Sequence, residues 1–313
     1  MSTVVCLLGY SLVVLVLGPP VLRRLTASGP APRLGVAAWL SAIVSVLATW
    51  AATTAIIAAQ LIGHWGHLDR LIVMCLTWLC RAVSGGVSGV GQAVVGGVLA
   101  AAAVAAVVAT IRLVRAVGVL RRRARQHAED VRLVGRGTSD DGVVVIDVPR
   151  PAAYCVSGSP PAIVFTSGAL DVLDERARAA VLAHERAHLA GHHLAVMTFL
   201  RAVARVFPGV ALMAEGAQQV SRLLEMCADD AAARRHGGAA LLSGLIALCG
   251  AAPAEALGAA DVAVLDRAER LAGPRAPFGV ATQIALVSAI VLAGLGPVMI
   301  GALAATGVSL CMG

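Results

Sequence analysis

The sequence DERARAAVLAHERAHLA, residues 174–190, decides which fold this chain can adopt. Apolar side chains recur at helical spacing up to the two histidines, and Asp174 is a suitable N-cap, so we predict a helix. His184 and His188 are four residues apart and therefore project from one face of that helix. Two imidazoles placed in this way can bind one tetrahedral zinc ion, with Glu185 beside the open coordination position. There Glu185 could take a proton from an attacking water and pass it to a leaving amine.

A catalytic zinc site needs a third protein ligand, and the nearby histidines do not supply it. His192 lies two turns beyond His184, about 12 Å along a straight helix, so one ion cannot reach His184, His188 and His192 together. The extended motif HExxHxxGxxH would require a histidine where this chain has Leu194, although Gly191 matches it. The three-histidine form of the site is therefore excluded.

Glu225 is the expected third ligand. It lies in a second predicted helix, from about residue 215 to 236, which Gly237 and Gly238 would end. If this helix packs against the first, Glu225 completes a His-His-Glu site for one Zn²⁺ ion. Asp229 follows one turn later on the same face and could accept the other ring N–H of a zinc-bound histidine.

Two further residues are candidates for contact with substrate or for proton relay. Arg222 lies one turn before Glu225, and it could bind a substrate carbonyl or form an ordinary surface ion pair. His192 could relay a proton, although His192 and His193 are more often polar surface residues or helix-end contacts.

The composition assigns the chain to membranes. Hydrophobic residues make up 58% of its 313 residues and charged residues only 14%, where soluble domains average about 25% charged. The net charge is +7, and all the basic residues are arginines. In a chain this apolar, arginines usually flank membrane spans, so we expect the lipid bilayer and a protein substrate as partners and no nucleic acid.

Four apolar runs are long enough to cross a bilayer. They cover residues 4–22, 35–63, 82–111 and 279–306. Positive residues follow the first and third runs and precede the last, at Arg23, Arg24, Arg112 to Arg125, Arg267, Arg270 and Arg275. By the positive-inside rule these connections face the cytoplasm of a multi-pass protein in the cell (plasma) membrane, and the short C-terminal tail lies outside.

The polar composition defines three parts of the chain. We expect an N-terminal transmembrane region at 1–111, a cytoplasmic zinc metallopeptidase domain at 112–278, and a C-terminal transmembrane helix with its tail at 279–313. The β-rich runs 143–148 and 162–166 predict a short sheet. The expected fold is thus a mainly α membrane protein of about four transmembrane helices, with a cytoplasmic α+β zincin-like metalloprotease domain.

Two apolar stretches do not qualify as spans. Residues 71–79 are too few to cross a bilayer, and Cys75 and Cys80 beside them could pair only in an oxidising compartment. The stretch 194–214 is interrupted by Arg201, Arg205 and Pro208, so we expect an amphipathic or membrane-adjacent helix pair there rather than a fifth span.

Together these residues resemble a known family, the BlaR/MecR-type integral-membrane zinc metallopeptidases, and more distantly the HtpX-like and CAAX-prenyl-protease-like membrane proteases. The resemblance covers about residues 143–273. It rests on the segments AYC at 153–155, IVFTSGAL at 163–170, LAHERAH at 182–188 and EMCAD at 225–229.

This resemblance implies a set of roles. His184, His188 and Glu225 would be the zinc ligands, Glu185 the base, and Asp229 a partner of a ligand histidine. The peptidase domain would face the cytoplasm between the third and last spans. The strand before the helix would present an edge to which an extended substrate could add as a β-strand.

One departure from the antibiotic-sensing members affects the expected function. Those members carry an extracellular penicillin-binding domain with a Ser-x-x-Lys motif, whereas this sequence contains no lysine. We expect proteolysis of a cytoplasmic or membrane-proximal protein, with a transcriptional repressor as one case. A quality-control protease of the HtpX-like kind and a non-catalytic membrane sensor that retains the zinc site are the alternatives.

Overall fold

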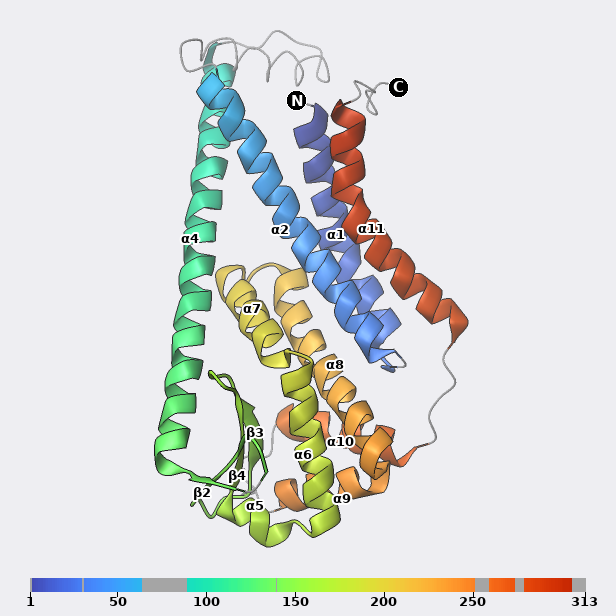
Figure 1. The fold of residues 1–313 in the computed structure, drawn as a ribbon. Helices are drawn as coiled ribbons and strands as arrows, with labels where there is room; N and C mark the ends of the chain where they lie inside the picture. The colour runs from blue at the N-terminus through green and yellow to red at the C-terminus, as the bar shows by residue number, and fades with distance from the viewer. Residues whose placement is uncertain are drawn as a thin grey trace.

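The computed structural model describes residues 2–29, 31–63, 89–138, 140–250, 259–273 and 279–305. Over these residues the chain is mainly helical, with one four-stranded mixed sheet. Long apolar helices gather towards one end of the molecule, and the sheet and shorter helices lie at the other (Figure 1). The expected fold class, a mainly α membrane protein with a small α+β domain, is confirmed.

Three of the described helices are long and apolar enough to cross a membrane: α1 (Ser2–Thr26), α2 (Pro32–Gly63) and α11 (Val280–Ala305). They pack against one another, and Tyr10 of α1 joins all three. Its hydroxyl donates a hydrogen bond to the carbonyl of Ala293 in α11 and lies 3.0 Å from Ser45 Oγ of α2. The predicted spans at 4–22, 35–63 and 279–306 correspond to these helices.

The predicted third span, 82–111, begins outside the described residues and continues into α4 (Gly89–Val134). The arginines from Arg112 onward do not end this helix, which runs on to Val134 as one element. The physical reason is local: between Ile111 and Val134 there is no proline and only one glycine, and Ala and Arg are strong helix formers. A charge cluster can end a membrane span without ending its helix.

The sheet has the strand order β1-β2-β4-β3. Its strands are β1 (Arg136–Gly137), β2 (Val143–Ile146), β3 (Ala153–Val156) and β4 (Ala162–Thr166). β2 and β4 are parallel, and β3 pairs antiparallel with β4. The strand directly before the helices, β4, is therefore interior and fully buried, and β3 is the strand at the edge. The expectation that the strand before the helix presents the free edge is wrong by one strand.

The remaining helices follow the sheet in the chain. They are α5 (Ser167–Val172), α6 (Glu175–Ala190), α7 (His193–Val206), α8 (Ala211–His236), α9 (Gly238–Gly250) and α10 (Ala259–Ala272). Asp174 caps α6 as predicted, because its carboxylate accepts a 2.7 Å hydrogen bond from the N–H of Ala177. Side chains of α6 cover one face of the sheet, and Ala128 and Val131 of α4 cover the other.

Helix α8 connects the two ends of the molecule. Its first half packs against α2 in the largest buried cluster, where Met213 and Val220 lie with Trp39 and Ile43, all of them fully buried. Its second half packs against α6 (Figure 1). The helix expected from residue 215 begins four residues earlier, at Ala211, so the stretch 194–214 divides into α7, a turn and the first residues of α8.

The close approach of α8 to α2 yields a stability prediction. A Cβ atom at Gly216 would lie 2.7 Å from Ile43 Cδ1 and 3.3 Å from Trp39 Cε3, so Gly216→Leu forces the helices apart. Overpacking of this kind costs about 1–3 kcal/mol, and we expect the thermal midpoint in detergent to fall by several degrees. Gly118→Leu is the control, because a Cβ there meets nothing within 4 Å. Equal midpoints for the two variants would contradict this packing.

Candidate metal centre

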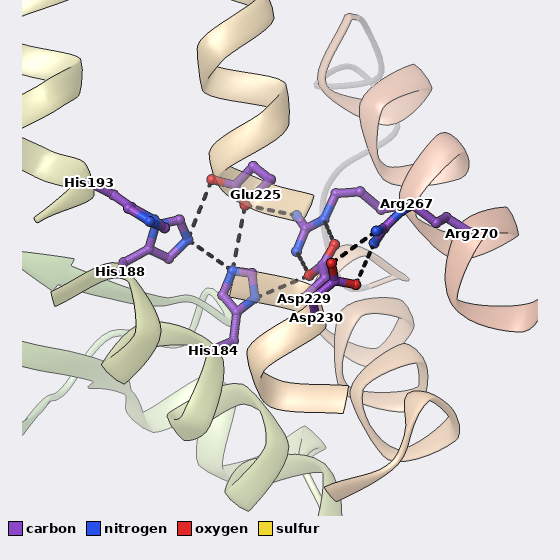
Figure 2. Close-up of polar contacts among 8 residues, drawn as sticks. All are labelled: His184, His188, His193, Glu225, Asp229, Asp230, Arg267 and Arg270. Carbon is purple, nitrogen blue, oxygen red and sulfur yellow. Dashed lines mark hydrogen bonds and ion pairs between the residues drawn. The ribbon is translucent and has the colours of Figure 1, made fainter. Parts of the chain in front are cut away.

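Three side chains from two helices converge between α6 and α8. His184 and His188 project from one face of α6, and Glu225 projects from α8 towards them (Figure 2). The two Nε2 atoms are 3.1 Å apart. Nε2 of His184 is 3.5 Å from Oε2 of Glu225, and Nε2 of His188 is 3.5 Å from Oε1 of the same carboxylate. Both histidines are buried, while the Glu225 side chain is 37% exposed.

These separations fit a tetrahedral metal ion. A zinc ion with ligands at about 2.0–2.2 Å places neighbouring ligand atoms about 3.3–3.5 Å apart. The separations of 3.1, 3.5 and 3.5 Å lie close to that range, the last two being to different oxygens of the Glu225 carboxylate, and one ligand atom from each residue lies within 4.8 Å of the others. Two imidazoles and one carboxylate also form a donor set that zinc accepts, and three protein ligands leave one position open.

Two further charged side chains, Asp229 and Arg267, contact two of the three candidate ligands from behind. Nδ1 of His184 is 3.1 Å from Oδ1 of Asp229, which is 1% exposed. Arg267 of α10 donates two hydrogen bonds to the Asp229 carboxylate, of 2.7 and 2.9 Å, and its Nη1 lies 3.2 Å from Glu225 Oε2 (Figure 2). Asp229 thus connects a ligand histidine to a buried arginine.

The ionisation of these groups follows from their contacts. Burial alone would raise the pKa of Glu225, but His184, His188 and Arg267 hold that pKa well below its ordinary value. Burial likewise opposes ionisation of Asp229, and His184 and Arg267 nevertheless lower its pKa. Both carboxyl groups are therefore negatively charged near neutral pH, as metal binding requires.

From the sequence, Arg267 was expected only to be one of the positive residues that precede the last membrane span. One pattern could have identified its contacts. Arg267 and Arg270 are three residues apart on α10, and Asp229 and Asp230 are adjacent on α8. Arg270 makes two hydrogen bonds to Asp230, of 2.9 and 3.0 Å, so the two arginines hold α10 against α8 in parallel (Figure 2).

Glu185 lies beside the ligands in a cleft of about 530 Å³. The cleft is bounded by α6, α7, α8 and α9 and by the edge strand β3, whose Ala153, Tyr154 and Cys155 line it. Burial raises the pKa of Glu185, and nearby His184 and His188 counteract that rise. Burial and the adjacent Glu185 raise the pKa of Cys155 to about 12, so its thiol stays protonated.

His193 contacts the site in a way that the sequence analysis missed. It is buried at the start of α7, and its Nδ1 lies 2.9 Å from Nδ1 of His188. Burial, and then the neighbouring His188, lower the pKa of His193 to about 4, so it is neutral and can accept the His188 ring proton. An imidazole so placed can fix the tautomer that presents Nε2 of His188 to a metal.

The two residues expected to contact substrate or relay protons are placed elsewhere. His192 is exposed and occupies the N-cap of α7 with a positive φ of 52°. Arg222 donates hydrogen bonds of 2.9 and 2.7 Å to the backbone carbonyls of Ala27 and Thr26, at the end of α1. The Arg222 guanidinium thus binds backbone carbonyls that have no partner within the helix at its C-terminus. Neither Arg222 nor His192 lines the cleft.

The comparisons with known proteins agree with this geometry. The sequence model of peptidase family M48 matches residues 119–252, which run from the lower part of α4 to just beyond α9. Comparison with curated proteins and with solved structures gives no significant match. The matched residues include His184, Glu185, His188, Glu225 and Asp229 but end before α10, and so before Arg267.

The contacts of Arg267 yield a prediction about metal affinity. Arg267→Ala would leave the buried carboxylate of Asp229 and the partly exposed carboxylate of Glu225 without their guanidinium partner, and Glu225 would be free to move. Loss of a partner behind a metal ligand typically costs 10- to 100-fold in affinity, and we expect a loss of about that size for zinc, measured by competition with a chelator. Arg270→Ala is the matched control, because it breaks a similar pair but touches no candidate ligand. If both variants lose affinity equally, docking of α10 rather than the Arg267 contact sets the affinity.

Proposed function

Because residues 119–252 form a peptidase family M48 domain in a chain with membrane-type helices, we propose that the protein is an integral-membrane zinc endopeptidase. The observation that carries the proposal is the fit of His184, His188 and Glu225 to one tetrahedral ion, with Glu185 in the adjoining cleft. The match to peptidase family M48 supports a metallopeptidase. That the metal is zinc, and that each residue has the role given below, is our inference.

The roles of the residues follow from their positions. His184, His188 and Glu225 would hold the ion, and a bound zinc ion would supply the Lewis acidity needed to activate water and to polarise a carbonyl group. Glu185 accepts the proton of the attacking water and delivers it to the leaving amine, which is the task of a general base and then a general acid. Its buried position and raised pKa suit both steps, because a stronger base takes the proton more readily.

Asp229 and His193 act through the ligands. Asp229 lies beside Nδ1 of His184, and His193 lies beside Nδ1 of His188. Each can therefore hold the ring proton on Nδ1 and leave Nε2 free to bind the ion. The two ligand histidines are supported by different chemical groups, a carboxylate that also binds Arg267 and a neutral imidazole.

The edge strand β3 is a suitable place for a substrate backbone. Among the residues that the structure describes, β3 pairs with β4 alone and leaves its other edge open, and the same strand lines the cleft beside Glu185. A peptide that adds to this edge gains main-chain hydrogen bonds whatever its sequence. An extended protein segment is thus the substrate class that the cleft accommodates.

The proposed location is the cell membrane, with the catalytic domain in the cytoplasm. Arginines follow the apolar part of α1, lie along α4 beyond Ile111 and precede α11 on α10. Under this proposal residues 112–278 form the cytoplasmic peptidase domain, between a transmembrane region at 1–111 and a last span from 279 onward. The substrate is then a cytoplasmic or membrane-proximal protein, and the resemblance to repressor-cleaving peptidases makes a transcriptional repressor the specific candidate.

The proposed chemistry is tested at Glu185. We expect the purified Glu185→Gln variant to bind about one zinc per chain, as the wild type does, and to lose proteolysis by at least about 100-fold. The amide keeps the shape of the side chain but cannot accept the proton. Zinc content by mass spectrometry and cleavage of a labelled casein substrate are the two measurements. Undiminished cleavage by the variant would overturn the assigned role.

The proposed orientation has its own test. A single added cysteine at Arg235, near the exposed end of α8, would lie in the cytoplasm, whereas one at Thr3 would lie outside. We expect a membrane-impermeant maleimide to label Thr3→Cys in intact cells and Arg235→Cys only after the cells are opened, in a background where the native cysteines are replaced. The reverse pattern would place the catalytic domain outside the cell.

A further inference from the structure

A second cavity, of about 220 Å³, adjoins the catalytic cleft. The two share Ala124 of α4, Ser157 after β3 and Thr198 of α7 as lining residues, so they lie side by side. Arg121 and Arg125 of α4 also line the second cavity, and Ser159 lies at its rim. None of its lining residues is acidic.

The two arginines face this cavity because of their positions on α4. Arg121 and Arg125 are four residues apart and share a helix face with Ala124, Ala128 and Val131. Ala128 and Val131 are buried against the sheet, which fixes that face towards the domain. All four arginines are exposed, but the neighbouring Arg122 and Arg123 lie on the other faces of the helix and line neither cavity. A role in flanking a membrane span explains the outward pair and leaves the inward pair unexplained.

The charge of this cavity is unbalanced. Among the residues that the structure describes, neither Arg121 nor Arg125 has a carboxylate within ion-pair distance. Arg201 of α7, on the rim of the catalytic cleft, adds a third exposed guanidinium near this end. The opposite side of the cleft is apolar, lined by Leu241, Leu245 and Leu248 of α9. The cleft therefore has a basic end and an apolar end.

The edge strand leads from the catalytic residues to the basic end. Cys155 of β3 faces Glu185, and the chain continues to Ser157, which lines both cavities. Two residues of extended chain cover about 7 Å, so a peptide lying along this edge would reach the arginines roughly two to four residues from the bond that is cut. Its side chain there would lie in the second cavity.

We propose that the cavity between α4 and the segment after β3 is a substrate subsite that binds an aspartate or glutamate side chain through Arg121 and Arg125. Guanidinium groups bind carboxylates by paired, charge-assisted hydrogen bonds, and a ligand carboxylate would supply the acceptor that the cavity lacks. The substrate then carries an acidic residue on one side of the cleaved bond and an apolar residue on the other. This inference rests on the proposed peptidase function and specifies its substrate class.

The test uses the full-length protein in detergent, loaded with zinc. Synthetic peptides that differ only in Glu, Gln or Lys at each position from two to four residues on either side of the cleaved bond give a kcat/KM ratio for each change. We expect a preference for Glu over Gln of about 3- to 10-fold at one such position, because the site is partly exposed to solvent. The double variant Arg121→Glu/Arg125→Glu should lose the preference for Glu and prefer the Lys peptide instead. The double variant Arg121→Gln/Arg125→Gln should lose the preference for Glu without gaining one for Lys.

Arg122→Glu/Arg123→Glu is the matched control, with the same charge change on the outward faces of the same helix. This control should keep the preference for Glu. A preference that is unchanged in the inward variants, or lost equally in the control, overturns the subsite. The subsite is also overturned if the inward and the outward double variants both weaken binding to vesicles with anionic lipids and neither changes the peptide preference. The arginines would then be lipid contacts.

A binding measurement separates this inference from the proposed function. Fluorescein-labelled Glu and Gln peptides are titrated against Glu185→Gln, alone and combined with Arg121→Gln/Arg125→Gln, and followed by anisotropy. Tighter binding of the Glu peptide that depends on the two arginines supports the subsite, even if the wild type cleaves nothing and the peptidase proposal fails. Cleavage by the wild type without any acidic preference overturns the subsite and leaves the peptidase proposal intact.

Discussion

The ion-pair network that joins Arg267 to Asp229 and Glu225 is the interaction on which the rest of the site depends. Two carboxylates lie within one helical turn of α8, and one of them is almost completely buried. Buried charges of the same sign are stable only when opposite charge and hydrogen bonds compensate them. The guanidinium of Arg267 supplies both to Asp229 with paired hydrogen bonds and contacts Glu225 as well. The charges of the candidate metal centre therefore help to hold α10 in place, together with the Arg270–Asp230 pair.

Helix α8 carries this centre and also belongs to the membrane-facing core. Its N-terminal half lies against Trp39 and Ile43 of α2, and its C-terminal half presents Glu225 and Asp229 to α6. Arg222, halfway along, binds the last carbonyls of α1. A single rigid element thus fixes the candidate metal ligand Glu225 relative to two of the apolar helices, which is unlike a site built on loops.

The features that could be predicted from the sequence are those encoded at short range. The spacing of His184 and His188, the cap at Asp174 and the apolar runs each depend on residues within a few turns of one another. Glu225 required one further assumption, that two predicted helices pack together, and the structure brings it to the histidines. The edge of the sheet was assigned to the wrong strand, because strand order depends on pairing between distant segments.

The features that could not be predicted depend on contacts across the fold. Arg267 lies 38 residues from Asp229 along the chain, and its pairing becomes visible only once α10 lies against α8. From the sequence, His193 was expected to be a polar surface residue or a helix-end contact. The turn at His192 instead starts α7 in a new direction and returns His193 to His188. For Arg222 the error was the reverse. It lies close to Glu225 in the sequence and was expected near the site, but its side chain points to α1.

The continuity of α4 also sets a distance. Its apolar part ends near Ile111, and the helix then runs without a break past Arg121 and Arg125. At 1.5 Å per residue those two positions lie about 15 and 21 Å beyond Ile111 along the helix axis. An extended peptide covers about 3.3 Å per residue, so a protein anchored in the same bilayer would need about five or six residues of free chain to reach them. Under the proposed function, the length of α4 beyond Ile111 therefore sets how far from the lipid surface a bond must lie to be cut.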